Sequence, residues 1–367
     1  MGISALSLLL LLLIIFSVTS SVISCPPSER AALLAFKSSL SEPYLPIFRT
    51  WSDPNCCRNW YGVTCDPTNS RVSDISLRSE ASIFTRHRHS GHISGTISPE
   101  ICNLHHLSTL ILSDWKNISG PIPSCISSSL PSLRLLDLSG NRLSSVIPSD
   151  IGLLRRLTVL DLAGNDLYGG IPASLTNLSS LMHLDLSNNR ISGRIPRDLG
   201  NLQMLSRTLL GRNLISGTIP PSISMMSRLA DLDLSQNRIS GEIPEEISGM
   251  PVLSSLYLDC NQISGVIPEG LMRSRGLNMV NLSRNSIEGS IPDVFGRRSY
   301  FNVMDLAHNR LTGRIPETLT SAGYVGHLNL SHNHLCGQIP DGSPFDRLEA
   351  SSFSSNDCLC GMPLRRC

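Results

Sequence analysis

The chain has 367 residues, of which 16% are charged and 5% aromatic, and its formal net charge is +1. A charge this close to zero excludes the broad basic surface with which proteins bind the phosphates of nucleic acids. The length alone would indicate two or three domains, but an internal repeat accounts for most of it.

Residues 1–24 have the character of a signal peptide. An apolar run at residues 8–16 is followed by small residues that lead to Ser24, just before Cys25. The first residues contain no Lys or Arg, which departs from the usual positive start and leaves an uncleaved anchor as the alternative. The run is short for a membrane span, and no second run of about 18 apolar residues follows. We therefore predict a secreted protein without a stable membrane anchor.

Residues 25–71 are predicted to form an N-terminal cap. The segment "SERAALLAFKSSL" predicts an amphipathic helix with Ser28 as its N-cap and with Ala31, Leu34 and Phe36 among its apolar residues. A stack of repeats exposes its apolar core at both ends, so the first repeat needs such a cover.

Residues 72–344 repeat the pattern L-x-x-L-x-L-x-x-N. With the first Leu as position 1, regular repeats with a period of 24 residues begin at Leu133, Leu157, Leu181, Leu205, Leu229, Leu253, Leu277, Phe301 and Val325. Another begins at Leu107, with one extra residue before Asn117, and an irregular one begins at Val72 with an insert before Ile93. These make eleven repeats. Positions 4 and 6 alternate as in a strand and point inward, while positions 3, 5 and 7 point outward, so stacked repeats form a parallel sheet on a concave face.

Two further features of the repeat are interpreted as structural. The G-x-I-P unit, as at residues 193–196 and 241–244, turns the chain at Gly and fixes an extended direction at Pro. Position 9 carries an amide that can satisfy backbone groups where each strand turns away. The residues of this column are Asn141, Asn165, Asn189, Asn213, Asn237, Asn261, Asn285, Asn309 and Asn333.

Ten of the eleven cysteines lie at the ends of the repeat region or in its first repeats. They are Cys25, Cys56, Cys57, Cys65, Cys102, Cys125, Cys336, Cys358, Cys360 and Cys367. Behind a signal peptide, such clusters predict disulfides and not metal ligands. Cys102 and Cys125 occupy nearly equivalent places in successive repeats, so we expect them to bond. Cys260 is left over at position 8, on the rim of the concave face, and is interpreted as an unpaired thiol, with a functional thiol as the alternative.

An acidic stripe is predicted along the middle of the concave sheet. Position 5 carries Asp137, Asp161, Asp185, Asp233 and Asp305, interrupted by Leu209, Tyr257, Asn281 and Asn329. Charges of one sign along a concave wall would attract a basic partner. The alternative is that "LDLS" is common in such repeats whatever they bind.

Side chains that depart from the repeat pattern are the best candidates for ligand contact, because the packing of the repeats does not demand them. Together with the Asp residues at position 5, these candidates are His183, Arg207, Leu209, Arg212, Asp231, Tyr257, Met279 and Arg284. Aromatic and Arg side chains are enriched among residues that dominate binding energy. We therefore predict a contact patch in the middle of the sheet, across the repeats that begin at Leu181 through Leu277.

Histidines and sequons complete the candidate residues. His308 and His332 share position 8, with His327 and His334 nearby, and are interpreted as surface residues, with a pH-responsive or metal-binding cluster as the alternative. Residues 86–92, "RHRHSGH", are interpreted as a mobile loop, with a basic contact to a partner as the alternative. Sequons for N-glycosylation occur at Asn117, Asn177, Asn281 and Asn329, of which Asn177 is expected on the convex side. The sequence predicts neither a metal site nor a cofactor.

The chain resembles the plant extracellular leucine-rich-repeat proteins, a group that includes the polygalacturonase-inhibiting proteins. It is more similar to the DNA-damage-repair/toleration family of leucine-rich-repeat proteins, in the segments "AFKSSLSEP" (35–43), "RVSDISLR" (71–78), "LSRTLLGRN" (205–213), "LDCN" (258–261) and "NLSRNSIEGSIPDVFG" (281–296). The insert before Ile93 departs from the shorter first repeat of the polygalacturonase inhibitors.

The resemblance implies an α/β solenoid, a right-handed superhelix of plant-type 24-residue repeats with disulfide-bonded caps, the second cap at residues 345–367. It also implies the cap pairings Cys25–Cys56, Cys57–Cys65, Cys336–Cys358 and Cys360–Cys367. A family name that mentions DNA is not carried over as a function, because a secreted, near-neutral solenoid has neither the location nor the charge for it.

The predicted function is binding and not catalysis, since the sequence has no motif for a nucleophile, a phosphate loop or a catalytic metal. We expect a secreted protein of the cell wall or apoplast that binds another protein or ligand through its concave sheet, in defence or signalling. The expected partner is a microbial wall-degrading enzyme or a receptor ectodomain. The alternatives are a polygalacturonase inhibitor and a protein that binds the wall or an ice surface.

Overall fold

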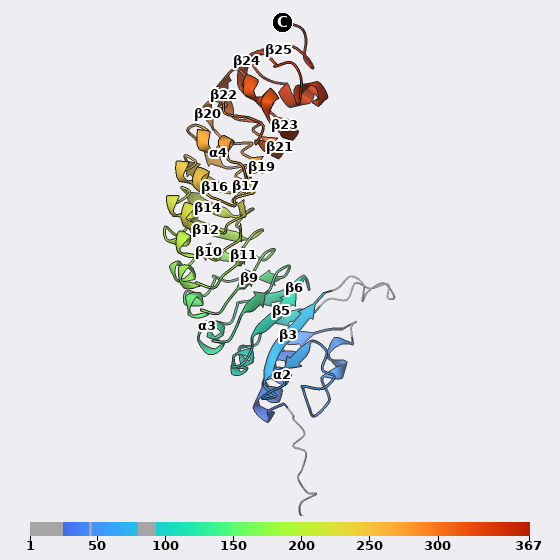
Figure 1. The fold of residues 1–367 in the computed structure, drawn as a ribbon. Helices are drawn as coiled ribbons and strands as arrows, with labels where there is room; N and C mark the ends of the chain where they lie inside the picture. Colours follow the sequence, from blue (N-terminus) through green and yellow to red (C-terminus); the bar gives the residue numbers. More distant parts are fainter. Residues whose placement is uncertain (1–24, 44–45, 80–92) are drawn as a thin grey trace, which may run out of the picture.

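Parallel strands stacked into a curved solenoid form the body of the molecule (Figure 1), as the 24-residue period predicts. The computed structural model describes residues 25–43, 46–79 and 93–367. The predicted signal peptide at residues 1–24 and the loop at residues 86–92 lie outside these ranges.

The longest sheet lines the inner side of the curve. Its β2 runs antiparallel to β3, and every later strand is parallel to the one before it. The twelve strands of this sheet in the described part of the chain are β2 (Val63–Cys65), β3 (Val72–Arg78), β5 (Thr109–Ser113), β7 (Leu135–Asp137), β9 (Val159–Asp161), β11 (His183–Asp185), β13 (Arg207–Leu209), β15 (Asp231–Asp233), β17 (Ser255–Tyr257), β19 (Met279–Asn281), β21 (Tyr300–Asp305) and β23 (Tyr324–Asn329). We call this the concave sheet.

A second set of short strands follows the concave strands from β3 onward, one after each, and β1 and β25 from the two caps extend it at its ends. These strands are β1 (Leu40–Ser41), β4 (Ser94–Thr96), β6 (Asn117–Gly120), β8 (Arg142–Leu143), β10 (Tyr168–Gly170), β12 (Arg190–Arg194), β14 (Leu214–Gly217), β16 (Arg238–Gly241), β18 (Gln262–Ile263), β20 (Glu288–Ser290), β22 (Arg310–Gly313), β24 (His334–Gln338) and β25 (Cys358–Cys360). Gly241 ends β16 with φ of 78°, and a Cβ there would lie 2.9 Å from Thr218 Cγ2. Only Gly fits this left-handed turn without strain.

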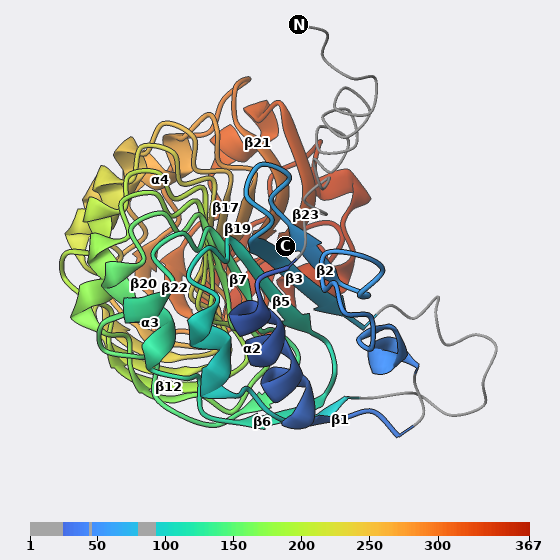
Figure 2. The ribbon, with the colours of Figure 1, turned by 90° about the horizontal axis from the view of Figure 1, so that it is seen from below.

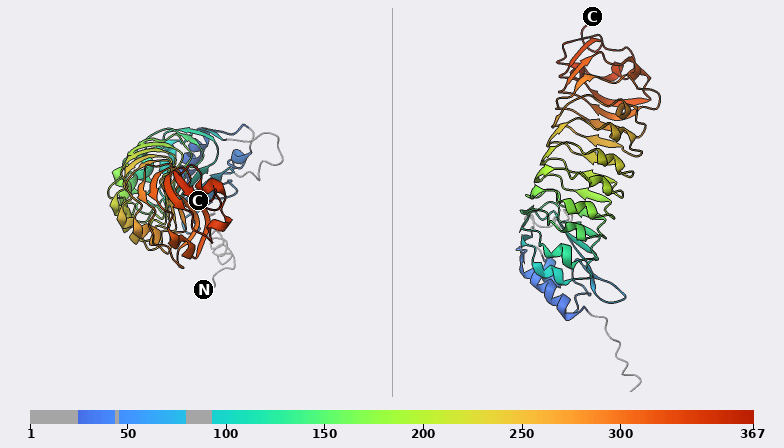
Figure 3. Two further views of the ribbon diagram at one scale, coloured as in Figure 1. Left: turned by 90° about the horizontal axis from the view of Figure 1, so that it is seen from above. Right: turned by 90° about the vertical axis from the view of Figure 1, so that its left-hand side faces the viewer.

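Short helical turns cover the outer side of the curve, which Figures 2 and 3 show from both ends and from the side. Most are 3₁₀ turns, and most of these come shortly after a G-x-I-P unit. The helical elements after the N-terminal cap are η3 (Pro99–Asn103), α3 (Cys125–Ser129), η4 (Ile151–Leu153), η5 (Ala173–Asn177), η6 (Leu199–Asn201), η7 (Pro221–Met225), η8 (Glu245–Gly249), α4 (Glu269–Arg273), η9 (Glu317–Ser321), η10 (Phe345–Arg347) and η11 (Ala350–Phe353). From η3 to α4, successive turns stack on each other along the solenoid.

The core is a column of apolar side chains enclosed by each turn of the solenoid. Positions 4 and 6 are buried as predicted, for example Leu160 and Leu162, which are 0% and 1% exposed. The concave strands pair at equal positions, so Asp137 lies beside Asp161 and Asp161 beside Asp185. Each repeat therefore adds one residue to every column on the concave face.

The Asn residues of position 9 form a hydrogen-bonded ladder between repeats. Asn237 Nδ2 donates to the carbonyl oxygens of Leu210 and Leu234 at 3.0 and 3.1 Å, and its Oδ1 accepts from the backbone N of Ile215 at 2.9 Å. Leu210 and Ile215 belong to the preceding repeat, so one side chain joins two turns of the solenoid. The interpretation of this column as structural is confirmed.

The ladder extends beyond the residues that the sequence pattern indicated. In the repeat that begins at Leu107, Asn117 does not join it but starts β6, and Trp115 takes the ladder place, with its Nε1 donating to Leu77 O at 2.7 Å. At the other end Asn356 continues the ladder, donating to Leu330 O and accepting from Leu335 N, both at 3.0 Å. The indole N–H satisfies the carbonyl of the repeat before it just as an amide does.

The N-terminal cap begins with helix α2 (Pro27–Ser38), and the structure corrects two expectations about it. Ser28 is not the N-cap: Pro26 takes that place, and the helix starts two residues earlier than expected, at Pro27, whose fixed φ suits the first turn. Ala31 is exposed and Leu34 only half-buried. The face toward the core is instead formed by Glu29, Ala32, Leu33 and Phe36, which follow the helical spacing of three and four residues.

A partly buried ion pair joins this cap to the start of β3. Glu29 is 0% exposed, and its two carboxylate oxygens accept from Arg71 Nε at 2.6 Å and from Val72 N at 2.8 Å. Next to it, Trp51 stacks on Trp60, with ring centroids 5.1 Å apart, beside the 3₁₀ turn η1 (Ile47–Thr50). The cap thereby closes the apolar end of the solenoid.

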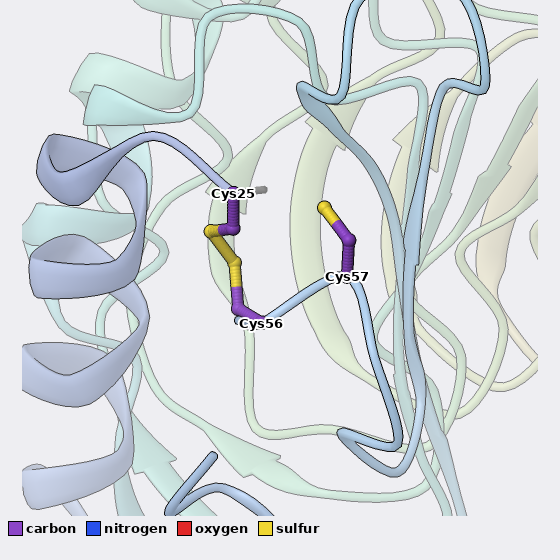
Figure 4. A group of neighbouring side chains, drawn as sticks. All are labelled: Cys25, Cys56 and Cys57. Carbon is purple, nitrogen blue, oxygen red and sulfur yellow. A yellow bond between two sulfur atoms is a disulfide. The ribbon is translucent and has the colours of Figure 1, made fainter. Parts of the chain in front are cut away.

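Five disulfides hold the caps and the first repeats. The cap bonds are the four that the family resemblance implied, and a fifth joins Cys102 to Cys125. Figure 4 shows Cys25 bonded to Cys56 beside Cys57, which itself bonds Cys65. The sulfur atoms of this cluster are therefore all in disulfides and are not available to a metal ion.

Within the described residues, no helix has both the length and the apolar character that crossing a membrane requires.

Replacing Asn237 with Ala should destabilise the solenoid strongly. The change leaves Ile215 N, Leu210 O and Leu234 O without their side-chain partner in the core, and each buried unpaired group costs about 1 kcal/mol or more. We expect the free energy of unfolding in urea to fall by about 3 kcal/mol. Asn201→Ala, at an exposed Asn that ends η6, is the matched control and should change it little. Equal effects of the two substitutions would contradict the ladder.

Candidate functional site

The carboxylates at position 5 have a structural role in addition to their charge. Asp161 Oδ1 accepts from Ala163 N at 3.1 Å and Asp185 Oδ1 from Ser187 N at 2.9 Å, which tightens the turn at the end of each strand. Asn281 makes the same bond to Ser283 N. Since a neutral amide serves this turn as well as a carboxylate does, the fold does not require the negative charge.

Asp137 is withdrawn from the acidic stripe that the sequence predicts. It is 6% exposed, and its Oδ2 accepts from Arg78 NH2 at 3.0 Å. Its Oδ1 accepts from the backbone N and the hydroxyl of Ser139. Arg78 comes from β3, two strands away, and neutralises Asp137, so Asp137 is a poor contact for a ligand.

Asp161, His183 and Asp185 meet on β9 and β11. One ligand atom from each, a carboxylate oxygen or an imidazole nitrogen, lies within 4.8 Å of the other two. Burial raises the pKa of Asp161 to about 6, and the nearby Asp185 and Asp137 add to this shift. Burial lowers the pKa of His183, and Arg207 acts in the same direction. The sequence marked all three residues as candidates but did not show that they meet.

The centre of the concave sheet combines a charged pair with an aromatic contact. Arg207 Nε lies 3.1 Å from Asp231 Oδ2 on the next strand, and both side chains are partly exposed. The hydroxyl of Tyr257 donates to the sulfur of Met279, with the two atoms 3.3 Å apart. These four side chains lie on neighbouring strands from β13 to β19, where the sequence analysis put the contact patch.

A row of left-handed residues runs beside the concave sheet at position 8. Gly140 and Gly164 occupy this place in two repeats, with φ of 64° and 62°. In later repeats it is held, with φ between 52° and 56°, by Asn188, Arg212, Gln236, Cys260, Arg284, His308 and His332. We call these seven residues the rim row. A non-Gly residue in this region costs about 1 kcal/mol, so long side chains stand here although Gly would fit better.

The departures from the repeat pattern identify members of the rim row, but not their backbone conformation. Gly140 and Gly164 in the same column are the sequence signal for it. His308 and His332 stack, with ring centroids 4.0 Å apart and planes at 9°. Burial lowers the pKa of His308, and His332 and Arg284 reinforce this. His334 does not join this stack, and its Nδ1 lies 3.1 Å from Asp357 Oδ1.

Cys260 is a free thiol beside Asp259. Burial raises the pKa of the Cys260 thiol, and the neighbouring carboxylate of Asp259 raises it further. A thiol shifted in this direction is less nucleophilic at neutral pH, which agrees with an unpaired and unreactive residue.

The four sequons lie in different surroundings. Asn177 is exposed at the end of η5, on the outer side of the solenoid. Asn281 and Asn329 are half-buried on the concave sheet, and each accepts from the Ser two residues later. Asn117 is half-buried at the start of β6.

Comparisons with known families identify both the cap and the repeats. A model described as the leucine rich repeat N-terminal domain matches residues 26–66. Leucine rich repeat models match residues 105–167, 180–202, 228–250, 252–274, 276–297 and 325–344. Repeats of this kind typically form extended binding surfaces and are not catalytic.

Two curated plant proteins illustrate the sequence similarity. The DNA damage-repair/toleration protein DRT100 of Arabidopsis thaliana is 57% identical over 137 residues, which are 36% of this chain and 37% of the relative. The polygalacturonase inhibitor of Pyrus communis is 33% identical over 114 residues, which are 30% of each chain. The matched part thus spans about a third of the length of these relatives.

Solved structures of plant proteins share the fold over most of the chain. A plant ice-binding protein has a TM-score of 0.70 and 29% identity, over 94% of this chain and 98% of the other. The Arabidopsis receptor kinase HAESA, in complex with the peptide hormone IDA and the co-receptor SERK1, has a TM-score of 0.67 and 30% identity, over 92% of this chain and 58% of the other.

Asp259 should make stability depend on pH. Burial raises its pKa, so the folded chain binds this proton more tightly than the unfolded chain does, and its contribution to stability falls as pH rises through the raised pKa. We expect Asp259→Asn to melt higher than the parent protein at pH 7, with the difference disappearing toward about pH 4, where the unfolded carboxyl is itself half protonated. Melting followed by circular dichroism at both pH values tests this, and a difference that does not depend on pH would refute it.

Proposed function

We propose that this chain, which belongs to the leucine-rich-repeat family, is a secreted recognition protein that binds another protein or ligand through its concave sheet. We place its action in the cell wall or apoplast, in defence or signalling. The observation that carries the proposal is that side chains which the fold does not require stand in continuous columns across the concave sheet and its rim.

The acidic stripe at position 5 supports this proposal, because the fold does not require its negative charge. Asn281 and Asn329 make the strand-end turn without any charge, and Leu209 and Tyr257 dispense with the turn bond from that position. Unpaired carboxylates on a concave wall attract basic groups and raise their rate of association. A partner with a basic surface is therefore favoured.

The rim row also supports the proposed binding function, because it places exposed Arg side chains at strained backbone positions. Arg212 and Arg284 are exposed at left-handed positions where Gly would cost less. Strained residues of this kind persist at sites where their side chains have a use. Arg is also among the residues that contribute most to protein interfaces. The acidic stripe and the arginines of the rim row together favour a partner that carries charges of both signs.

The relatives support a binding role of this kind. One solved structure with the same fold is a receptor kinase in complex with a peptide hormone and a co-receptor, and one curated relative is an inhibitor of polygalacturonase. A receptor ectodomain or a microbial wall-degrading enzyme is therefore the class of partner that we propose for this chain.

Secretion is supported by the apolar segment before Cys25 and by the five disulfides, which form in oxidising compartments. Asn177, exposed on the outer side, is the sequon that we propose to carry a glycan. Glycans on Asn281 and Asn329 would cover part of the concave sheet, so we expect these two sites to be empty. Peptide mapping by mass spectrometry reads each site.

Glycine at the rim offers a test in which binding is separated from stability. The partner is first captured from apoplastic fluid on the immobilised protein and identified by mass spectrometry. We expect the double variant Arg212→Gly/Arg284→Gly to bind it at least about tenfold more weakly, because two Arg contacts are lost. Its melting temperature should stay the same or rise, since Gly suits φ near 55°.

Arg238→Ala is the matched control, because Arg238 is an exposed Arg on β16, away from the concave sheet. It should keep full affinity. Tyr257→Ala and Arg207→Ala extend the test to the centre of the sheet. Full affinity in the rim variant and in both of these would contradict the concave sheet as the binding surface.

Two alternative functions have their own direct measurements. The similarity to the pear polygalacturonase inhibitor favours inhibition of a fungal polygalacturonase, which would slow pectin hydrolysis when the two proteins are mixed. The similarity to the plant ice-binding protein over nearly its whole length favours binding to ice, which would produce thermal hysteresis. If inhibition or thermal hysteresis is observed and is unchanged in the rim variant, in Tyr257→Ala and in Arg207→Ala, that activity would be the function in place of the one proposed.

A further inference from the structure

A three-residue cluster on the concave sheet has the composition of a metal site. His183 and Asp185 stand two residues apart on β11 and therefore project from the same face, and Asp161 pairs with Asp185 from β9. The ligand atoms of the three side chains lie within 4.8 Å of one another. Two carboxylates and an imidazole thus converge although they come from two repeats.

The charge of this cluster is not balanced by the protein. On one side Asp137 is paired with Arg78, and on the other Arg207 is paired with Asp231 at 3.1 Å. Among the described residues, no salt bridge reaches Asp161 or Asp185. Two carboxylates that share a partly buried site without a cation repel each other, and a divalent ion would remove this cost.

The strand-end turns hold the two carboxylates in place. Oδ1 of Asp161 and Oδ1 of Asp185 each accept a backbone N–H two residues later, which restricts both side chains. A donor that is already restricted loses less conformational entropy when it binds an ion. The remaining lone pairs of both carboxylates are left for a ligand.

We propose that Asp161, His183 and Asp185 bind a divalent transition-metal ion of the zinc class. A mixed set of one imidazole and two carboxylates suits Zn²⁺ and Co²⁺, whereas Ca²⁺ and Mg²⁺ prefer oxygen ligands alone. Three protein ligands leave a coordination position open, so the ion would also offer a contact for an anionic group. This site goes beyond the proposed recognition of a partner and does not depend on it.

The chain contains a near copy of this arrangement that serves as an internal comparison. Asp305, His327 and Asn329 occupy the same three places on β21 and β23, since Asp305 pairs with Asn329 just as Asp161 pairs with Asp185. There an amide replaces the second carboxylate, so the charge that would hold the ion is halved. His327 is also more exposed than His183. We therefore expect the ion at His183 and not at His327.

Zinc binding to tag-free protein, first treated with EDTA and then dialysed, tests the proposal. Isothermal titration at pH 7.5 should show one Zn²⁺ site with a Kd of about 10 µM or tighter, and Zn²⁺ should raise the melting temperature. Titration with Co²⁺ should give the visible absorption of a bound ion as an independent signal. Ca²⁺ at the same concentration should not displace the bound Co²⁺.

Matched variants locate the ion. His183→Gln and Asp161→Asn/Asp185→Asn should weaken Zn²⁺ binding at least tenfold while still folding, as shown by their melting without metal. His327→Gln and the double variant His308→Gln/His332→Gln should bind as the parent protein does. The proposal is overturned if Zn²⁺ does not bind at about 1 mM. It is also overturned if binding survives in His183→Gln, or if the histidine controls abolish it. None of these results depends on the identity of the protein partner.

Discussion

The hydrogen bonds of one Asn side chain per repeat are the constraint on which the rest of the solenoid depends. Asn237, for example, joins Leu210 O and Ile215 N of the preceding repeat to Leu234 O of its own. These bonds satisfy buried backbone groups where each strand leaves the sheet, at a place where hydrogen bonds between strands cannot satisfy them. Because the nine regular repeats are tied by an Asn at the same position, the concave strands pair at equal positions and each outward position forms a column along the sheet.

The regular columns explain how a repetitive fold acquires a specific surface. Packing fixes positions 4, 6 and 9. Position 5 needs no charge, because Asn281 makes the strand-end turn with an amide and Leu209 and Tyr257 occupy this position without that bond. The other outward positions are not constrained by packing. In the middle of the sheet they carry charged and aromatic side chains. Arg207 neutralises Asp231 there, whereas Asp161 and Asp185 have no cationic partner among the described residues. His183 lies close to both of these carboxylates, with the ligand atoms of the three side chains within 4.8 Å of one another.

At the two ends of the solenoid, other residues take over the role of the repeat Asn. Trp115 takes the place of Asn in the repeat that begins at Leu107, and Asn356 continues the ladder into the C-terminal cap. The substitution is incomplete at its junction, since Asn141 Oδ1 is buried without a protein partner. Glu29 and Arg71 tie the N-terminal helix to the first strand, and disulfides hold both caps. The ends thus rely on covalent and ionic bonds where stacking has only one neighbour.

The sequence by itself determined the 24-residue repeat, its inward-facing positions and its Asn column, because these depend on spacing along the chain. It also marked His183, Arg207 and Tyr257 as departures from the pattern. Tertiary structure decided how such residues combine. That Arg78 neutralises Asp137, that Trp115 replaces an Asn and that Asp161, His183 and Asp185 converge all depend on contacts between repeats. Packing of helix α2 on η3 likewise decided that Glu29, Ala32 and Leu33 face the core, although the local pattern had indicated Ala31 and Leu34.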